Sequence, residues 1–319
     1  MNRLNSLLKR MGMGKPWSDF IPEAENVPKR RAERLAAPLP EREFFVLFTP
    51  RSGSSMLSDL ARRTGALGKP NELFNPNHMA GIARALDATD LDSYVEIARR
   101  SQQRGGTFGF KIAYPQLDAV FPSEQAFLDY FEAPKTFWLI RRDIVAQAVS
   151  LYKMQKTKLA HSPSSTPEER AAREAEVEYD GAEIQHWLNH IRRAEESTEA
   201  LIANAGLDPL RMSYERNIEL KPNQLANVMV RHVGLRTMRL PGVESAHSKI
   251  GTDLNTDFSD RFRAEYADWL ARVEAERAPM LDRISYYGPP QDKDGKAKAG
   301  KTRRKGKSSK AAKARRKRE

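Results

Sequence analysis

Short runs of apolar residues recur along the chain and predict the strands of a buried sheet. The first run, residues 44–48, contains only Phe, Val and Leu, and similar runs follow at 108–113, 136–140 and 210–213. Continuous apolar runs of this length are typical of strands buried on both faces, as in a parallel sheet. We therefore expect these four segments to form a common core.

Helical patterns of apolar residues fill the intervals between these runs. They occur at 91–100, 144–154, 182–203 and 222–233. From Ser259 onward, apolar residues recur at three- and four-residue steps, which predicts a C-terminal helix that closes the core. Alternating strands and helices favour the α/β class. The prediction is an α/β fold, in which a mainly parallel central sheet is flanked by helices within a single domain of residues 44–290.

The flanking segments differ from this domain. Residues 1–43 form an N-terminal lead-in, expected to be irregular from about 14 to 40 because prolines interrupt it. Its first 13 residues have a basic amphipathic pattern, which fits either a terminal helix or a membrane-surface segment. A charged insertion at 161–180 fits a surface loop or an exposed helix. Residues 291–319 lack the apolar surface needed to fold and predict a disordered basic tail.

The net charge of +12 belongs almost wholly to this tail. Residues 291–319 hold 14 of the 54 Lys and Arg but only 3 of the 42 Asp and Glu, which leaves the rest of the chain almost neutral. A tail of this kind binds anionic lipid, nucleic acid or acidic polysaccharide through nonspecific electrostatics. A purely solubilising role is the alternative, and the composition favours neither.

Composition also excludes several kinds of chemistry. The chain has no Cys and six His, which removes disulfides and thiolate chemistry and favours a reducing compartment. His186 and His190 lack the Glu of an HExxH motif and a third ligand, so no metal is expected. No apolar stretch reaches the roughly 18 residues of a membrane span. We expect a cytoplasmic protein, with peripheral attachment at the inner face of the membrane as an alternative.

A polar loop separates the first strand from the next helical pattern. It consists of Arg51, Ser52, Gly53, Ser54 and Ser55. Such a loop offers backbone N–H groups and the positive end of a helix dipole, and its glycine lets an anion approach closely. It lacks the Walker A lysine, which disfavours an ATPase or kinase. The loop by itself fits an anion site and a serine-capped helix equally well.

A second polar motif follows the strand at 136–140. Arg142 stands directly after Arg141, and Ser150 lies eight residues further along the next helical pattern. A guanidinium can grip a phosphate with two N–H groups, and a hydroxyl two turns along the helix can reach a neighbouring oxygen. The spacing therefore favours a second phosphate site at Arg142 and Ser150, and a pair of arginines on a solvated face is the alternative.

Together these motifs resemble those of the sulfotransferases that use 3′-phosphoadenylyl sulfate (PAPS). The segments at 48–55, 68–74, 108–111 and 141–150 are most similar to the bacterial trehalose 2-sulfotransferase type, in order over about residues 44–270. The resemblance implies a P-loop-like α/β fold, PAPS as co-substrate and no metal. It assigns residues 51–55 to the 5′-phosphosulfate, Arg142 and Ser150 to the 3′-phosphate, and Tyr214 to the neighbourhood of the adenine.

The same resemblance implies the catalytic residues. Glu72 matches the glutamate that the trehalose-type family uses as general base, whereas Ala113 stands where many animal sulfotransferases have a histidine base. Lys111 matches the lysine that would steady oxygens of the transferring group. Without the resemblance, Glu72 pairing with Lys69 or capping a helix would be the simpler interpretation. For Lys111 the alternative to a catalytic role is a side chain that extends to the surface. For Tyr214 the alternative to a contact with adenine is a core position at a strand end.

The expected function is therefore transfer of a sulfuryl group from PAPS to a hydroxyl of a carbohydrate or glycolipid, with Glu72 as the base. The trehalose-type family has a tryptophan after a Gln-x-Thr sequence, but this chain continues from Thr157 with Lys158 and Leu159, which puts trehalose itself in doubt. The alternatives are another nucleotide-phosphate transferase and a non-catalytic protein that binds nucleic acid through its tail. A homodimer is left open.

Overall fold

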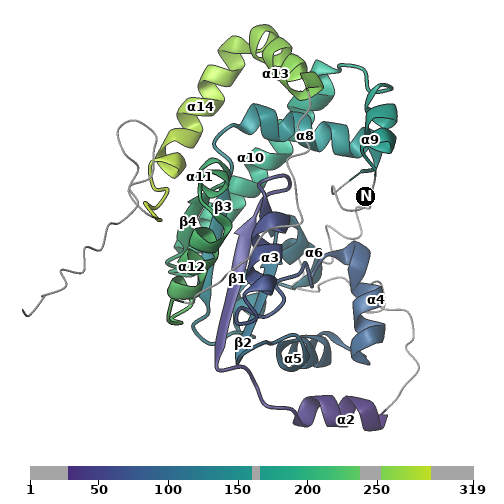
Figure 1. Ribbon diagram of the computed structural model, residues 1–319, viewed down its shortest axis with the longest axis vertical. Coiled ribbons are helices and arrows are strands. Elements are labelled where there is room, and N and C mark those ends of the chain that lie inside the picture. The colour runs from purple at the N-terminus through teal and green to yellow at the C-terminus, as the bar shows by residue number, and fades with distance from the viewer. Residues whose placement is uncertain (1–27, 160–165, 238–252, 289–319) are drawn as a thin grey trace, which may run out of the picture. The chain divides into compact units, whose positions relative to one another are not determined.

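A computed structural model describes residues 28–159, 166–237 and 253–288. Its centre is a parallel sheet with the strand order β2-β1-β3-β4 (Figure 1). The strands are β1 (Arg42–Phe48), β2 (Thr107–Ile112), β3 (Lys135–Ile140) and β4 (Leu210–Ser213). Each strand coincides with an apolar run in the sequence. The predicted α/β fold with a parallel central sheet is confirmed.

The strands are almost completely buried because helices cover both faces of the sheet. The helices between and after the strands are α3 (Ser54–Arg63), α4 (Pro76–Leu86), α5 (Leu91–Ser101), α6 (Tyr114–Val120), α7 (Glu124–Leu128), α8 (Ile144–Thr157), α10 (Gly181–Asn204), α11 (Tyr214–Glu219) and α12 (Pro222–His232). On one side, the rings of Phe45, Phe110 and Phe127 pack with centroids 5.4–6.2 Å apart. Aromatic contacts of this kind add to the free energy of burial.

The C-terminal helical pattern forms two helices rather than the single helix expected from Ser259 onward. These are α13 (Asp253–Glu265) and α14 (Ala267–Leu281). Tyr266 separates them because its backbone, at φ −116° and ψ 25°, leaves the helical region. Phe262, Leu270 and Val273 from this pair share a hydrophobic core with α8 and α10.

Two further helices lie in segments without apolar patterns. The helix α2 (Pro28–Ala36) lies in the lead-in that was expected to be irregular, and this expectation was wrong there. Pro28 occupies its first position, where the missing N–H costs nothing, and Pro38 follows its end. The helix α9 (Pro167–Glu174) fits the exposed-helix interpretation of the charged insertion. The amphipathic segment 1–13 and the tail 291–319 lie outside the described residues.

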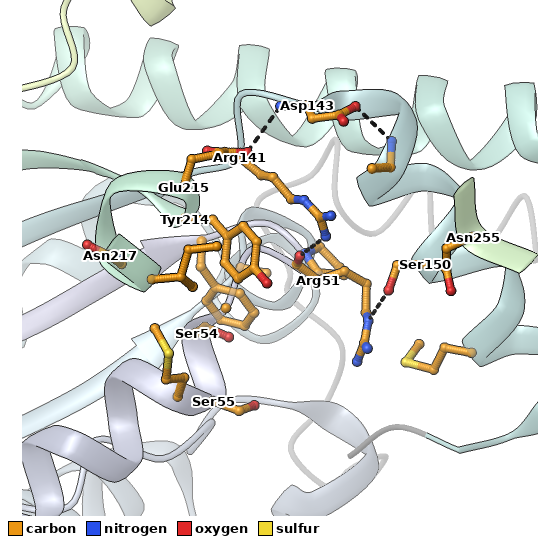
Figure 2. Close-up of a pocket in the computed structure, with 18 of the residues that line it drawn as sticks. Arg51, Ser54, Ser55, Arg141, Asp143, Ser150, Tyr214, Glu215, Asn217 and Asn255 are labelled. Atoms are coloured by element: carbon orange, nitrogen blue, oxygen red, sulfur yellow. Dashed lines mark hydrogen bonds between the residues drawn. The ribbon is translucent and has the colours of Figure 1, made fainter. Parts of the chain in front are cut away.

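The strand order determines where a ligand can bind. From the central β1 the chain passes first to β2 on one side, and then to β3 on the other side of β1. In open α/β sheets, ligands bind outside the carboxyl ends of the strands at such a reversal. The polar loop after β1 and the arginine-containing turn after β3 meet at this position (Figure 2).

Candidate active site

A cavity of about 1350 Å³ opens beside the loop after β1 and the turn after β3. Its lining also comes from α4, α8, α11 and α13. The predicted site residues that line it are Arg51, Gly53, Ser54, Ser55, Glu72, Ser150 and Tyr214. The fold therefore brings together residues that are up to 163 positions apart in the sequence.

The loop after β1 is shaped by two residues with left-handed backbone conformations. Arg51 has φ 65°, and Gly53, which precedes the first residue of α3, has φ 88°. A Cβ atom on Gly53 would lie 2.7 Å from Cδ2 of Tyr214, so the tyrosine ring packs directly over the glycine. The loop requires glycine here for both its conformation and its close contact with Tyr214.

Hydrogen bonds within the loop separate its serines into two groups. The hydroxyl of Ser52 is buried and donates to the carbonyl of Thr49 over 2.7 Å. From α8, the amide of Gln147 donates to the Thr49 hydroxyl over 2.8 Å and to the Pro50 carbonyl over 2.7 Å. Ser52 and Gln147 therefore stabilise the loop, whereas Ser54 and Ser55 line the cavity (Figure 2).

Two arginines meet between Tyr214 and Ser150 (Figure 2). The Nε of Arg51 donates to the Ser150 hydroxyl over 3.0 Å, and Arg141 donates to the Arg51 carbonyl over 3.1 Å. The guanidinium of Arg141 lies 4.7 Å from the ring centroid of Tyr214. Burial lowers the pKa of both guanidinium groups, and the charge of Arg141 lowers that of Arg51 further. Two adjacent cations in a partly buried cavity favour an anionic ligand.

Arg142, which the sequence analysis assigned to a phosphate, is not brought into this cavity. Its side chain is exposed, whereas Arg141 lines the cavity. The carboxylate of Glu215 holds the backbone of this turn in place, because it accepts the N–H groups of Arg142 and Asp143 over 3.1 and 3.2 Å. Within the described residues, the buried Nε of Arg141 has no hydrogen-bond partner. Arg141 is therefore the better candidate for a phosphate ligand.

The turn after β3 is also fixed from the C-terminal helix α14. Arg277 donates to the carbonyls of Arg141 and Arg142 over 2.8 and 2.9 Å. It also makes a two-point ion pair with Glu195 of α10, at 2.8 and 2.9 Å. Both side chains are buried. Sequence reasoning missed this pair, because nothing in the local pattern distinguishes Arg277 from the other charged residues of α14.

The two predicted catalytic residues form an ion pair beside the loop. The Nζ of Lys111, at the end of β2, lies 3.1 Å from Oε1 of Glu72. It also donates to the hydroxyls of Ser54 and Ser55 over 3.3 and 3.4 Å. Glu72 therefore pairs with Lys111 and not with Lys69, and Lys111 is buried instead of reaching the surface. This lysine physically links the carboxylate to the anion loop.

Opposing influences act on the pKa of Glu72. Burial alone would raise it, but the ammonium of Lys111 and hydrogen bonds from Asn75 and Gln116 outweigh burial and lower it. Burial lowers the pKa of Lys111 against the opposing charge of Glu72. Sequence reasoning missed Asn75 and Gln116. The available signals were Asn75 before Pro76, a typical helix start, and a glutamine three residues after Ala113.

Neither a membrane-spanning helix nor a cluster of metal-binding side chains occurs among the described residues. None of the described helices is long and apolar enough to cross a membrane. Among the same residues, no group of three or more His, Asp or Glu side chains has the geometry to bind a metal ion. His186 and His190 lie on α10 with their rings 5.1 and 5.7 Å from Trp187.

A family model described as Stf0 sulphotransferase matches residues 43–265. The chain belongs to the Stf0 sulphotransferase family. Similar proteins include two enzymes described as trehalose 2-sulfotransferase. One, from Mycobacterium tuberculosis (strain ATCC 35801 / TMC 107 / Erdman), is 26% identical over 211 residues, covering 54% of this chain and 77% of the relative. The other, from Mycolicibacterium smegmatis (strain ATCC 700084 / mc(2)155), is 24% identical over 211 residues, which cover 54% of this chain and 76% of the relative.

Family membership confirms the resemblance inferred from the motifs and supports a sulfuryl-transferring enzyme. The matched span contains the anion loop, Glu72, Lys111 and the turn that carries Arg141. Arg277 lies beyond this span, although it contacts the turn directly. The C-terminal helix therefore contributes to the site from outside the matched region.

Proposed function

We propose that this chain transfers the sulfuryl group of PAPS to a hydroxyl group of a carbohydrate acceptor. The observation that carries this proposal is the position of Lys111. Its ammonium lies 3.1 Å from the carboxylate of Glu72 and 3.3 Å from the hydroxyl of Ser54 in the anion loop. A candidate base and a cation for the transferring group therefore stand together beside the loop that would hold the phosphosulfate.

The cavity fits a nucleotide with phosphates at two positions. Residues 51–55 would hold the 5′-phosphosulfate through backbone N–H groups and the hydroxyls of Ser54 and Ser55. Arg141 and Ser150, with Arg51 between them, would hold the 3′-phosphate. The unpartnered Nε of Arg141 supports this assignment, because a phosphate oxygen would supply its missing acceptor. Tyr214 would contact the nucleoside, as the resemblance implies.

Sulfuryl transfer requires positioning and charge stabilisation more than covalent chemistry. The acceptor oxygen bonds to sulfur in line with the breaking bond between sulfur and the bridging phosphate oxygen. The proton of the acceptor hydroxyl passes to Glu72, and the bond electrons leave with the phosphate. Lys111, Ser54 and Ser55 would stabilise negative charge on the oxygens around sulfur. Glu72 is ionised at neutral pH, as a base must be, but its lowered pKa makes it a weaker proton acceptor. Its action as a base therefore rests on its placement next to the acceptor hydroxyl.

The surroundings of Glu72 suit a polyhydroxylated acceptor. The residues that line the cavity with Glu72 include Asn75, Asn77, His78 and Gln116. Amide and imidazole groups can exchange hydrogen bonds with sugar hydroxyls. Because both relatives are described as trehalose 2-sulfotransferases, trehalose is the first acceptor to test, with glycolipids carrying the same sugar as the second.

Ligand-induced stabilisation tests the donor assignment. Adenosine 3′,5′-bisphosphate, the product of the donor, should raise the melting temperature, whereas ATP at the same concentration should not. Deletion of residues 291–319 should leave this response unchanged if the tail is an accessory. Stabilisation by ATP alone would instead favour another nucleotide-phosphate transferase. A lack of response to both ligands would contradict the donor site.

Substitution of Glu72 tests the proposed base. Glu72→Gln should reduce sulfuryl transfer from PAPS to trehalose by roughly 100-fold or more, because general-base catalysis typically contributes that much. Binding of adenosine 3′,5′-bisphosphate should persist. Glu274→Gln, the same change at an exposed position of α14, is the matched control. Near-normal turnover of Glu72→Gln, measured by mass spectrometry of the sulfated product, would exclude the base assignment.

A further inference from the structure

Two side-chain amides converge on one oxygen of Glu72. The Nδ2 of Asn75 donates to Glu72 Oε2 over 2.9 Å, and the Nε2 of Gln116 donates to the same oxygen over 2.9 Å. Asn75 precedes α4, and Gln116 lies in the first turn of α6. Two helix starts, separated by 41 positions in the chain, therefore hold a single carboxylate oxygen.

The orientation of both amides is determined by backbone N–H groups. The Oδ1 of Asn75 accepts the N–H of Asn77 over 3.1 Å, and the Oε1 of Gln116 accepts the N–H of Ala113 over 3.0 Å. An amide side chain has one accepting and one donating end. Because each oxygen is engaged by a helix start, each NH₂ group faces Glu72.

The second oxygen of Glu72 faces the anion loop. Its Oε1 lies 3.1 Å from Nζ of Lys111, which in turn contacts the hydroxyls of Ser54 and Ser55. Each carboxylate oxygen has about two lone-pair positions. The amides of Asn75 and Gln116 occupy both lone-pair positions of Oε2. Lys111 occupies one lone-pair position of Oε1, so the other can accept a hydrogen bond from a further donor. Oε1 is therefore the oxygen nearer to the sulfuryl group that the loop would hold.

We propose that Asn75 and Gln116 form an amide clamp that holds Glu72 Oε2 and aims Oε1 at the acceptor hydroxyl as the proton-accepting atom. This inference rests on the proposed function and identifies positioning residues for it. Ala113, at the position of the histidine base of animal sulfotransferases, contributes its backbone N–H to the clamp. Among the described residues, the charged group that acts on Glu72 is Lys111 from β2, and His78 from α4 is a titratable group that lines the same cavity.

Two substitutions remove the donors while preserving the helix starts. Asn75→Ser keeps a side-chain oxygen suited to cap α4 but cannot reach Glu72. Gln116→Glu keeps the oxygen that accepts the Ala113 N–H but replaces the donated hydrogen bond with a second carboxylate. The matched control is Gln224→Glu, because Gln224 accepts the N–H of Lys221 over 3.0 Å at the start of α12 and does not line the cavity.

The titration of Glu72 is the first readout, and it requires no acceptor. Carbon-13 NMR of the labelled carboxyl group, assigned with Glu72→Gln, should show a pKa raised by about one unit in Asn75→Ser, because a hydrogen bond to the charged form is lost. Gln116→Glu should raise it at least as much, since neighbouring carboxylates disfavour each other's ionisation. Gln224→Glu should leave the titration unchanged.

The second readout is the pH dependence of transfer from PAPS to trehalose. Since the base must be ionised, a raised pKa should move the acid limb of the kcat/KM profile to higher pH by about the same amount. At neutral pH, kcat should fall roughly ten- to a hundredfold because the carboxylate is misplaced, while KM for PAPS stays unchanged. A merely structural defect would not move the acid limb.

The outcomes separate the clamp from the proposed function. Wild-type transfer together with an unshifted titration and acid limb in both clamp variants would overturn the clamp and leave the function intact. A wild-type chain that transfers no sulfate from PAPS to any carbohydrate acceptor would instead overturn the function and the clamp with it. Shifts in both readouts, confined to the clamp variants, support the inference.

Discussion

Arg141 belongs to the turn after β3 and Arg277 contacts this turn from α14, but the surroundings of the two arginines are opposite. Arg277 makes two contacts with Glu195 and two with backbone carbonyls. Arg141 packs over Tyr214 and donates to one carbonyl, and none of the described carboxylates lies within ion-pair distance of it. The first guanidinium has its hydrogen-bonding capacity satisfied within the protein. The guanidinium of Arg141, which lines the cavity, still has an N–H group at Nε without an acceptor among the described residues.

This difference separates a structural arginine from a binding arginine. Burial lowers the pKa of Arg141, and Tyr214, Glu215 and Asp143 only partly offset this effect. Such a group lowers stability unless a ligand completes its contacts, which is typical of functional sites. The buried pair of Arg277 and Glu195 instead fixes the turn so that the Arg141 side chain points into the cavity.

The largest expected effect is the loss of stability when this pair is broken. Arg277→Met should lower the free energy of unfolding by about 3–5 kcal/mol, because it leaves Glu195 buried without its partner. Denaturant unfolding followed by circular dichroism measures the change. The double variant Arg277→Met with Glu195→Met should regain much of the loss. A single variant as stable as the wild type would show that the pair does not hold the turn.

The same substitution at Arg141 should affect binding instead of stability. Arg141→Met should weaken binding of adenosine 3′,5′-bisphosphate by roughly ten- to a hundredfold, the usual value of a hydrogen bond between charged groups. Its free energy of unfolding without ligand should stay the same or rise. Isothermal titration calorimetry and denaturant unfolding check the two parts. A large loss of stability with unchanged affinity would reverse the roles of the two arginines.

The smallest effect is expected at Arg142. Arg142→Met should change the free energy of unfolding by less than about 0.5 kcal/mol, because its side chain is exposed. Affinity for adenosine 3′,5′-bisphosphate should match that of the wild type. If calorimetry shows a loss comparable with that of Arg141→Met, the assignment based on spacing is correct and Arg141 is not the main ligand.

Much of the fold could be predicted because its strands are buried on both faces and leave continuous apolar runs. The loop at 51–55 could also be recognised from its composition and its place after a strand, although only the other motifs favoured an anion site over a serine-capped helix. The lead-in helix α2 could not be predicted, because none of its side chains is buried and its sequence therefore shows no apolar stripe. The break at Tyr266 was missed because aromatic residues continue at helical spacing on both sides of it.

The class of fold, the family, the loop at 51–55 and the candidate base Glu72 could be predicted from the sequence, because each leaves a local pattern or motif. Which arginine of the Arg-Arg pair enters the cavity depends on contacts with distant segments. Glu215 accepts the N–H groups that follow Arg141, and Arg277 donates to the carbonyls of both arginines. The tertiary structure also decided the surroundings of Glu72. Hydrogen bonds from two helix starts and a lysine on β2 depend on packing between segments that no local pattern connects.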